Sequence, residues 1–113
     1  MNASGPLPLE PLLRLLGTPR ETPLLHMSIA LALQQRDRRD EAMAHLRTAV
    51  ARDPAYAAAH RLLGLLALES GDAAAARTAF AEGLEAARQR GDKQLEKELA
   101  VRLRRLDRTP PEA

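Results

Sequence analysis

The sequence predicts an all-α fold built from antiparallel helical hairpins. Ala and Leu, which favour helices, are abundant, whereas the 113-residue chain holds one Tyr, one Phe and no Trp, so few of its residues favour strands. Apolar residues recur every three or four positions along most of the chain, which is the spacing of one helical face. The pattern also repeats internally at a fixed offset. Together these observations predict helices that pack closely through small and aliphatic side chains.

Composition and charge restrict the function classes. The chain has no cysteine, which excludes disulfides and thiolate metal sites and fits a cytoplasmic protein. It shows neither a leader-like N-terminus nor the roughly 20 apolar residues of a membrane span, so we expect neither secretion nor membrane insertion. The net charge is only +2, from 17 basic and 15 acidic residues. Such a small excess creates little field to attract nucleic acid or an anionic membrane.

Caps and breakers predict the helix boundaries. The pairs Thr22-Pro23 and Asp53-Pro54 each combine a good N-cap residue with a proline that suits the first helical position, so each should open a helix. A shorter helix is expected within Leu9–Leu16, starting near Pro11 and ending at Gly17. The long helices expected cover 23–35, 41–50, 54–69, 73–90 and 92–106.

An offset of 34 residues superposes one helical hairpin on the next. The coincident residues agree in size and character: Ala30 with Gly64, Ala42 with Ala76, Leu46 with Phe80, Ile29 with Leu63, and His26 with His60. The small residues stand where two helix backbones must approach closely, and the large ones fill the wider gap toward the next hairpin. The duplication therefore predicts two copies of one structural unit.

In these positions the chain resembles the tetratricopeptide repeat (TPR) family. The family's slots for small, large and closing residues match Ala30, Ala42, Leu46, Ala49 and Pro54 in a first repeat over 23–56. In a second repeat over 57–90 they match Gly64, Gly71, Ala76, Phe80 and Gly83, with Gly71-Asp72 similar to the family's inter-helix turn. The resemblance implies a TPR-like superhelix of helical hairpins.

The flanking segments follow from the same resemblance. Residues 91–107 resemble the helix that closes such arrays, with Asp92 as its cap, a leucine stripe toward the second repeat and charges in water. Residues 1–22 form an N-terminal segment whose short helix could cover the first repeat. We expect residues 108–113 to be a disordered tail, because paired prolines follow.

Several positions depart from the family pattern. Its aromatic slots hold His26 and Leu33 in one repeat and His60 and Ala67 in the other, and Asp37 replaces the turn glycine. Arg88 replaces the closing proline, so the last helix of the second repeat should run about one turn longer. Neither His26 nor His60 has an Asp or Glu three or four residues later, so both are interpreted as packing residues and no metal is expected.

Nothing in the sequence predicts catalysis. Ser28 lies inside an expected helix without an identifiable base, and Ser70 precedes a turn glycine. There is no glycine-rich phosphate loop and no His-Glu-x-x-His motif. We therefore expect a non-catalytic protein without a cofactor.

The resemblance also implies a concave groove lined by the first helix of each repeat. The groove-facing slots fall on Leu24, Met27, Leu31, Gln34, Ala58, Arg61, Leu65 and Leu68. This mostly apolar strip suits a peptide or amphipathic helix of a partner protein. Binding of chaperone tails is not expected, because the positions of the family's carboxylate-binding residues hold Met27, Leu31, Leu62, Asp92 and Glu96.

Three other occupants or functions stay open. The strip could be filled by the chain's own N-terminal segment, or by a second copy in a self-associating structural subunit. Arg88–Arg108 carries eight basic residues against four acidic ones and could contact RNA. Their signs are interleaved and no aromatic residue is available to stack on bases, which favours a solvated capping helix.

Overall fold

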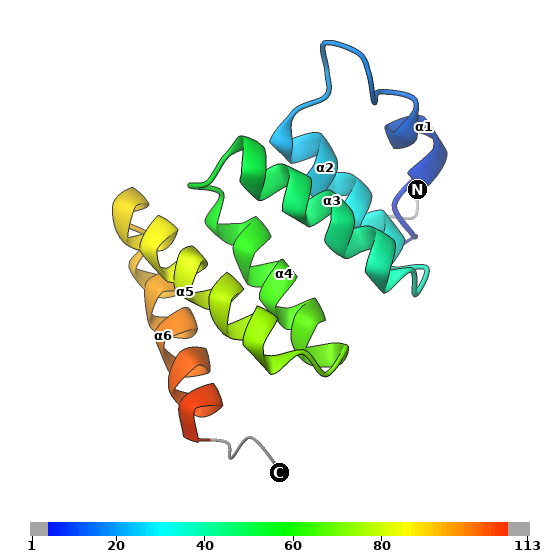
Figure 1. Cartoon of the computed structure of the whole chain (residues 1–113). Coiled ribbons are helices and arrows are strands. Elements are labelled where there is room, and N and C mark those ends of the chain that lie inside the picture. Colours follow the sequence, from blue (N-terminus) through cyan, green and yellow to red (C-terminus); the bar gives the residue numbers. More distant parts are fainter. Residues whose placement is uncertain (1–4, 109–113) are drawn as a thin grey trace. The chain divides into compact units, whose positions relative to one another are not determined.

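A computed structural model describes residues 5–108, and this part of the chain is helical without any strand (Figure 1). The helices are α1 (Leu9–Leu13), α2 (Pro23–Gln34), α3 (Arg39–Arg52), α4 (Ala57–Glu69), α5 (Ala73–Arg90) and α6 (Lys93–Arg108). Consecutive long helices pack in pairs, α2 with α3, α4 with α5, and α5 with α6. The all-α prediction is thus confirmed. The chain divides into two units, which meet between Arg52 and Asp53 and are described separately.

The first unit contains α1, α2 and α3. Thr22 caps α2 as predicted, because its side chain accepts a hydrogen bond from the N–H of Leu25 at 3.1 Å, and Pro23 is the first helical residue. Helix α1 packs on α2. The predicted start of α1 near Pro11 is wrong: the helix begins at Leu9 and ends at Leu13. Pro11 is tolerated there because the first N–H groups of a helix have no intrahelical acceptor.

The turn that joins α2 to α3 has the same geometry as the turn that joins α4 to α5. Asp37 and Gly71 occupy the left-handed region, with φ of 57° and 82°. In both turns the next N–H reaches a carbonyl five residues back, at 3.0 and 2.9 Å. This pairing satisfies a carbonyl that the ended helix leaves open. Asp37 therefore takes the conformation of the glycine it replaces.

Asp53-Pro54 does not open a helix, which corrects the sequence prediction. Asp53 instead starts a turn: its carboxylate accepts from the N–H of Ala55 at 3.2 Å, and its carbonyl from the N–H of Tyr56 at 3.0 Å. Helix α4 begins at Ala57 without a side-chain cap. The aspartate carboxylate is engaged by the residue two positions ahead, as in other aspartate turns, and the helix starts after the turn closes.

Small residues bring the helices of the second unit together. Gly64 of α4 lies against the ring of Phe80, where a methyl group would overlap the ring. A side chain at Gly83 of α5 would meet His60 of α4 and Leu99 of α6, each at 3.0 Å. Ala42 and Ala76, the small residues that the repeat equates, are both fully buried. The prediction that small side chains mark close helix contacts is confirmed.

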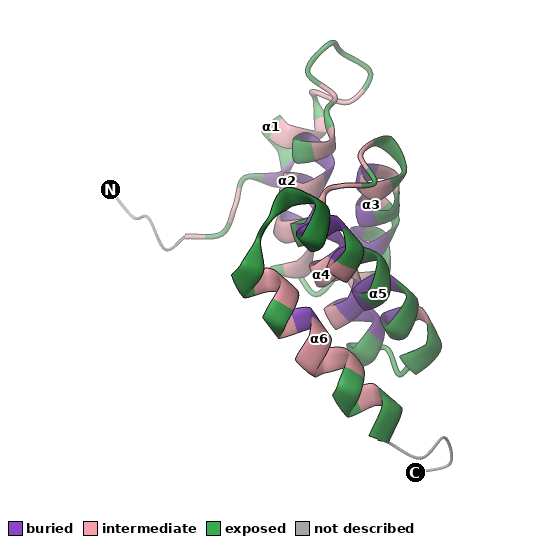
Figure 2. Cartoon of the chain, turned by 90° about the vertical axis from the view of Figure 1, so that its left-hand side faces the viewer, coloured by how far each residue is buried: buried purple, intermediate pink, exposed green. Residues whose placement is uncertain are grey.

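Helix α5 has 18 residues where α3 has 14. This is the extra turn that Arg88 predicts in place of the closing proline, and Gly91 ends it with φ of 71°. Asp92 then caps α6 by accepting from the N–H of Leu95 at 3.1 Å. Leu99 is the buried residue of α6 (Figure 2). Arg108 still belongs to α6, contrary to prediction, and the rest of the expected tail, 109–113, lies outside the described residues.

Candidate functional site

The first unit carries the predicted strip of α2. Leu24, Met27, Leu31 and Gln34 are spaced by three, four and three residues and therefore share one helical face. Leu24 is 64 % exposed, and the other three are half-buried. The N-terminal segment is anchored near the other end of α2, where the N–H of Leu7 donates to Gln35 Oε1 at 2.6 Å. That segment leaves Leu24 open to solvent.

The second unit carries the predicted strip of α4 at the same spacing. Ala58 and Leu68 are exposed, whereas Arg61 and Leu65 are half-buried. Arg61 does not project freely: its Nε donates to Oε2 of Glu98 on α6 at 2.6 Å. This ion pair extends the α4 strip sideways onto α6, which the sequence interpretation treated only as a cap.

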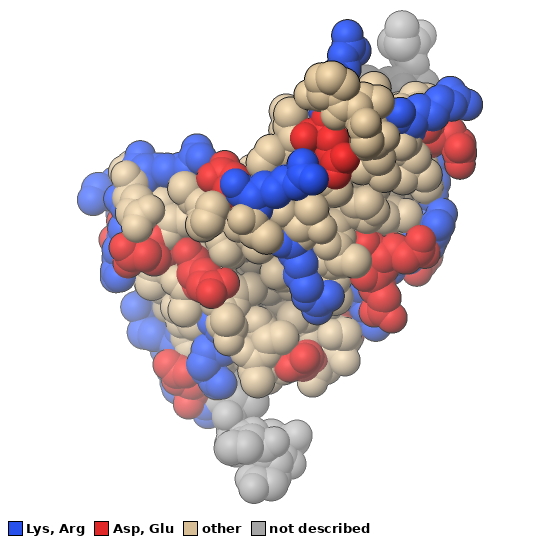
Figure 3. Space-filling model, turned by 45° about the horizontal axis from the view of Figure 1, so that its top comes forward, with Lys and Arg blue, Asp and Glu red and all other residues tan. Residues whose placement is uncertain are grey.

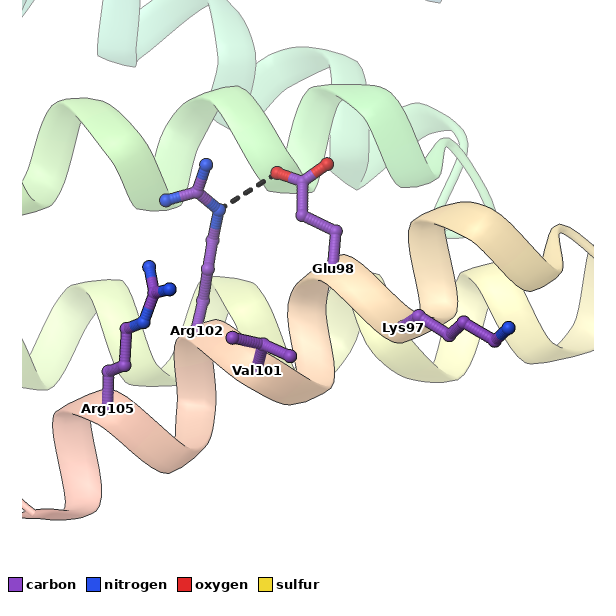
Figure 4. A pocket seen from close by; sticks show the side chains of 5 residues that line it. All are labelled: Lys97, Glu98, Val101, Arg102 and Arg105. Carbon is purple, nitrogen blue, oxygen red and sulfur yellow. Dashed lines mark hydrogen bonds and ion pairs between the residues drawn. The ribbon is translucent and has the colours of Figure 1, made fainter.

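A cavity of about 330 Å³ lies along α6, lined by Lys97, Glu98, Val101, Arg102 and Arg105. Figure 4 shows Glu98 and Arg102 pointing from α6 toward α4. Arg102 Nε donates to Glu98 Oε2 at 2.8 Å, and the Arg102 guanidinium lies 5.9 Å from the centre of the Phe80 ring. Burial alone would raise the pKa of Glu98, but the hydrogen bonds from Arg102 and Arg61 outweigh it and lower the pKa below its usual value. Glu98 is therefore ionised at neutral pH.

The sequence interpretation missed the α6 residues of this surface, although a signal for them exists. Arg61 and Glu98 are 37 residues apart, and the same shift carries Leu65 onto Arg102 and Leu68 onto Arg105. The offset exceeds 34 because α5 is longer than α3 and delays the start of α6. Testing only the period of 34 hides this third row of residues.

The two equivalent histidines are both 4 % exposed, but they differ in their polar contacts. His26 Nε2 lies 2.9 Å from Oε2 of Glu21, and its Nδ1 lies 2.9 Å from Nδ1 of His45 on α3. His60 Nε2 donates to the carbonyl of Pro54 at 2.9 Å. His26 thus ties the loop before α2 to α3, whereas His60 fastens the turn before its own helix.

Glu21 is the centre of the polar cluster in the first unit. It accepts from the N–H of Gly17 at 2.7 Å and from Arg52 at 3.0 Å, besides His26. The Gly17 N–H and the His26 ring lower the pKa of Glu21. Burial, and then the nearby His26, lower the pKa of His45. Because a carboxylate only accepts, neutral His26 donates from Nε2 and accepts at Nδ1 from His45.

The described residues offer little machinery for metal binding or catalysis. Within residues 5–108, no group of three or more His, Asp or Glu side chains is placed to hold a metal ion. The Ser70 hydroxyl donates to the carbonyl of Ala67 at 2.8 Å, so it closes α4. In the same part of the chain, no helix has the length and apolar character that crossing a bilayer requires.

Charges elsewhere on the second unit are mostly paired across helices. Arg77 contacts Asp107 at 3.1 Å, and Glu96 lies between Arg88 at 3.5 Å and Lys93 at 3.9 Å. On the face shown in Figure 3, basic and acidic side chains are intermingled rather than gathered in one basic field. Of the positions compared with a carboxylate clamp, Glu96 forms these pairs and Asp92 caps α6.

Comparisons with known proteins agree with this architecture. The tetratricopeptide repeat family model matches residues 33–95. A TPR repeat-containing protein of Pseudomonas aeruginosa is 48 % identical over 69 residues, which are 61 % of this chain and 66 % of that protein, slightly less than two thirds of its length. A Bordetella parapertussis protein with a known solution structure is 39 % identical, with a TM-score of 0.72 over 96 % of this chain and 90 % of its own.

TPR repeats generally mediate protein–protein interaction, and the proteins that contain them are generally not enzymes. The matched residues span more than half of the chain and include both predicted hairpin turns and the whole of α3, α4 and α5. The chain belongs to the tetratricopeptide repeat family.

Proposed function

We propose that this TPR protein is a non-catalytic adaptor that binds a peptide or helix of a partner protein on the strips of α2 and α4. One observation carries the proposal. Among the described residues, the large hydrophobic side chains left exposed are Leu24, at 64 %, and Leu68, at 37 %. Both belong to the groove-facing slots inferred from the sequence. A single exposed leucine means little, but two at equivalent faces of repeated helices indicate a contact surface.

The two strips have chemistry suited to a helix or extended peptide. Each presents side chains at three- and four-residue spacing, which matches the anchor spacing of an amphipathic ligand helix. Met27 can adjust its shape to a partner because its side chain is unbranched and polarizable. Arg61 adds a polar contact at the middle of the α4 strip.

Affinity purification from native lysate with quantitative mass spectrometry tests the proposal. The variant Leu24→Asp/Leu68→Asp places charges on the two exposed positions without disturbing the core. Its matched control, Ala51→Asp/Ala81→Asp, introduces the same charges at exposed positions of α3 and α5. We expect the first variant to lose the partners that the wild type and the control recover. Equal recovery by all three proteins would refute the proposal.

Two alternatives make different predictions for the same variants. If the strips join copies of this chain, light scattering should show a mass that rises with concentration and falls in Leu24→Asp/Leu68→Asp. If the chain binds RNA through α6, affinity should fall steeply with salt and be insensitive to the leucine changes. A constant monomer mass and no RNA binding at low salt would leave protein binding as the function.

A further inference from the structure

The surface of the second unit is apolar along α4 and basic along α6. On α4, Leu65 and Leu68 form the apolar side. On α6, the cavity of about 330 Å³ is lined by Lys97, Arg102 and Arg105 together with one acid and Val101. The ion pair of 2.6 Å between Arg61 and Glu98 joins the two helices. A ligand that rests on α4 therefore has basic side chains beside it.

The basic side of this surface is not neutralised by its own acid. Four bases, Arg61 and the three that line the cavity, surround the one carboxylate of Glu98. That carboxylate accepts from Nε of both Arg61 and Arg102. Within residues 5–108 the terminal amino groups of these two guanidiniums have no protein acceptor. Their N–H donors remain suited to a carboxylate from outside the unit.

The other arginines of this unit have a different arrangement. Arg77, Arg88 and Arg90 each contact an acid on another helix or on the turn before α4, at distances of 3.1 to 3.5 Å. Positive charge in excess of acid is thus concentrated beside the α4 strip. An excess of one sign in a hollow attracts the opposite charge and disfavours a like-charged partner.

We propose that the partner segment is an acidic amphipathic one, which places apolar side chains on Leu65 and Leu68 and Asp or Glu side chains at the α6 cavity. This inference rests on the proposed function and specifies the chemistry of its ligand. A protein segment is favoured over RNA because the aromatic residues of this unit are Tyr56 and the buried Phe80, which leaves no stacking platform in the cavity.

Selection from a displayed library of random 16-residue peptides tests the inference on the full chain. We expect the wild type to enrich peptides that combine Leu, Ile or Phe at helical spacing with a net negative charge. Their measured affinity should fall about tenfold or more in Lys97→Glu/Arg105→Glu, because two favourable charge contacts become repulsive. The control Arg104→Glu/Arg108→Glu makes the same charge change on exposed α6 residues that do not line the cavity, and should stay within about twofold.

The outcomes separate this inference from the proposed function. Enriched peptides that are neutral or basic, or that bind Lys97→Glu/Arg105→Glu as tightly as wild type, would overturn the acidic specificity. If those peptides are still lost in Leu65→Asp/Leu68→Asp, the binding surface stands and only its specificity falls. Failure to enrich any peptide also overturns the inference. A polyuridylate 30-mer that binds the wild type and competes with the peptides would transfer the site to RNA.

Discussion

The two repeats share their backbone geometry and differ in the groups that fill it. Both hairpins turn at a left-handed residue, Asp37 or Gly71, and both bury a histidine at the same slot. The close contact of α4 uses Gly64 with Phe80, whereas the equivalent slots of the first repeat hold Ala30 and Leu46, both fully buried. One repeat combines the smaller small residue with the larger large one.

This difference teaches which features a repeat preserves. Positions 34 residues apart keep the size rule and the turn, because helix approach and chain reversal depend on backbone geometry. Polar partners are not preserved: His26 joins a Glu21–His45 cluster, while His60 bonds a backbone carbonyl. The exposed faces also diverge, since α6 adds its basic cavity to the second unit alone. Functional specificity is therefore expected where the repeats differ.

Exchange of the small residues should produce the largest effect. Gly64→Ala drives a methyl group into the Phe80 ring, and we expect it to lower the free energy of unfolding by about 1–3 kcal/mol, as overpacking does. The double variant Gly64→Ala/Phe80→Leu recreates the pair of the first repeat and should recover part of the loss. Urea denaturation measures both. A Gly64→Ala protein as stable as wild type would refute the size rule.

Replacement of the buried histidines should separate the two repeats next. His26→Phe removes contacts to both Glu21 and His45, whereas His60→Phe removes the bond to the Pro54 carbonyl. We expect His26→Phe to cost roughly 1–2 kcal/mol more, because it leaves more polar groups unsatisfied. The comparison needs only denaturation midpoints and slopes of the two variants. Equal losses would mean that the polar cluster adds no stability.

The turn residues predict a smaller change of opposite sign. Asp37 has φ of 57°, which glycine adopts with less strain, so Asp37→Gly should raise the free energy of unfolding by about 0.5–1 kcal/mol. Gly71→Ala, with φ of 82° at the equivalent position, should lower it by about 1 kcal/mol. Thermal unfolding followed by circular dichroism would show the two melting temperatures moving apart. Parallel shifts would contradict the shared turn geometry.

Acidification should have the smallest effect, confined to the first unit. The pKa of His45 is lowered from its usual value of 6.5, so the unfolded chain takes up a proton more readily than the folded one. The free energy of unfolding therefore falls as the pH drops below about 6.5, until folded His45 is also protonated. Glu21, whose pKa is also lowered, keeps its contribution until the pH falls below about 4.5.

The charged groups around this histidine pair are Glu21, Arg52 and Glu41. Protonation of both rings would set two N–H groups against each other at the 2.9 Å contact between the Nδ1 atoms. His45→Gln should flatten the pH dependence between 7.5 and 5.5 in amide hydrogen exchange of the first unit. An unchanged dependence in that variant would exclude His45 as its source.

The sequence predicted the architecture well because its signals are local. Caps at Thr22, Asp72 and Asp92, and breakers at Gly91, act within a few residues of each helix end. Asp53-Pro54 misled because a cap followed by proline also suits a turn, and only the bond from Ala55 to Asp53 distinguishes them. Local pattern does not encode which of the two occurs.

The polar contacts were harder to predict because they join residues far apart in the chain. Glu98 and Arg61 are 37 residues apart, and Arg52 and Glu21 are 31. The eight groove-facing positions could be proposed from the repeat, whereas the α6 residues required the extra turn of α5 to be known first. His45 was not expected beside His26, since it lies on the second helix of the repeat and has no counterpart 34 residues later, where Ala79 stands.

Chemical-shift mapping with a selected acidic peptide tests most directly whether a partner binds the surface where the repeats differ. With leucine methyl groups and arginine side chains labelled, we predict the largest shifts at Leu65, Leu68 and Arg102, and smaller ones across the core. Shifts confined to the outer faces of α3 and α5, around Ala44 and Ala81, would contradict the proposed binding surface.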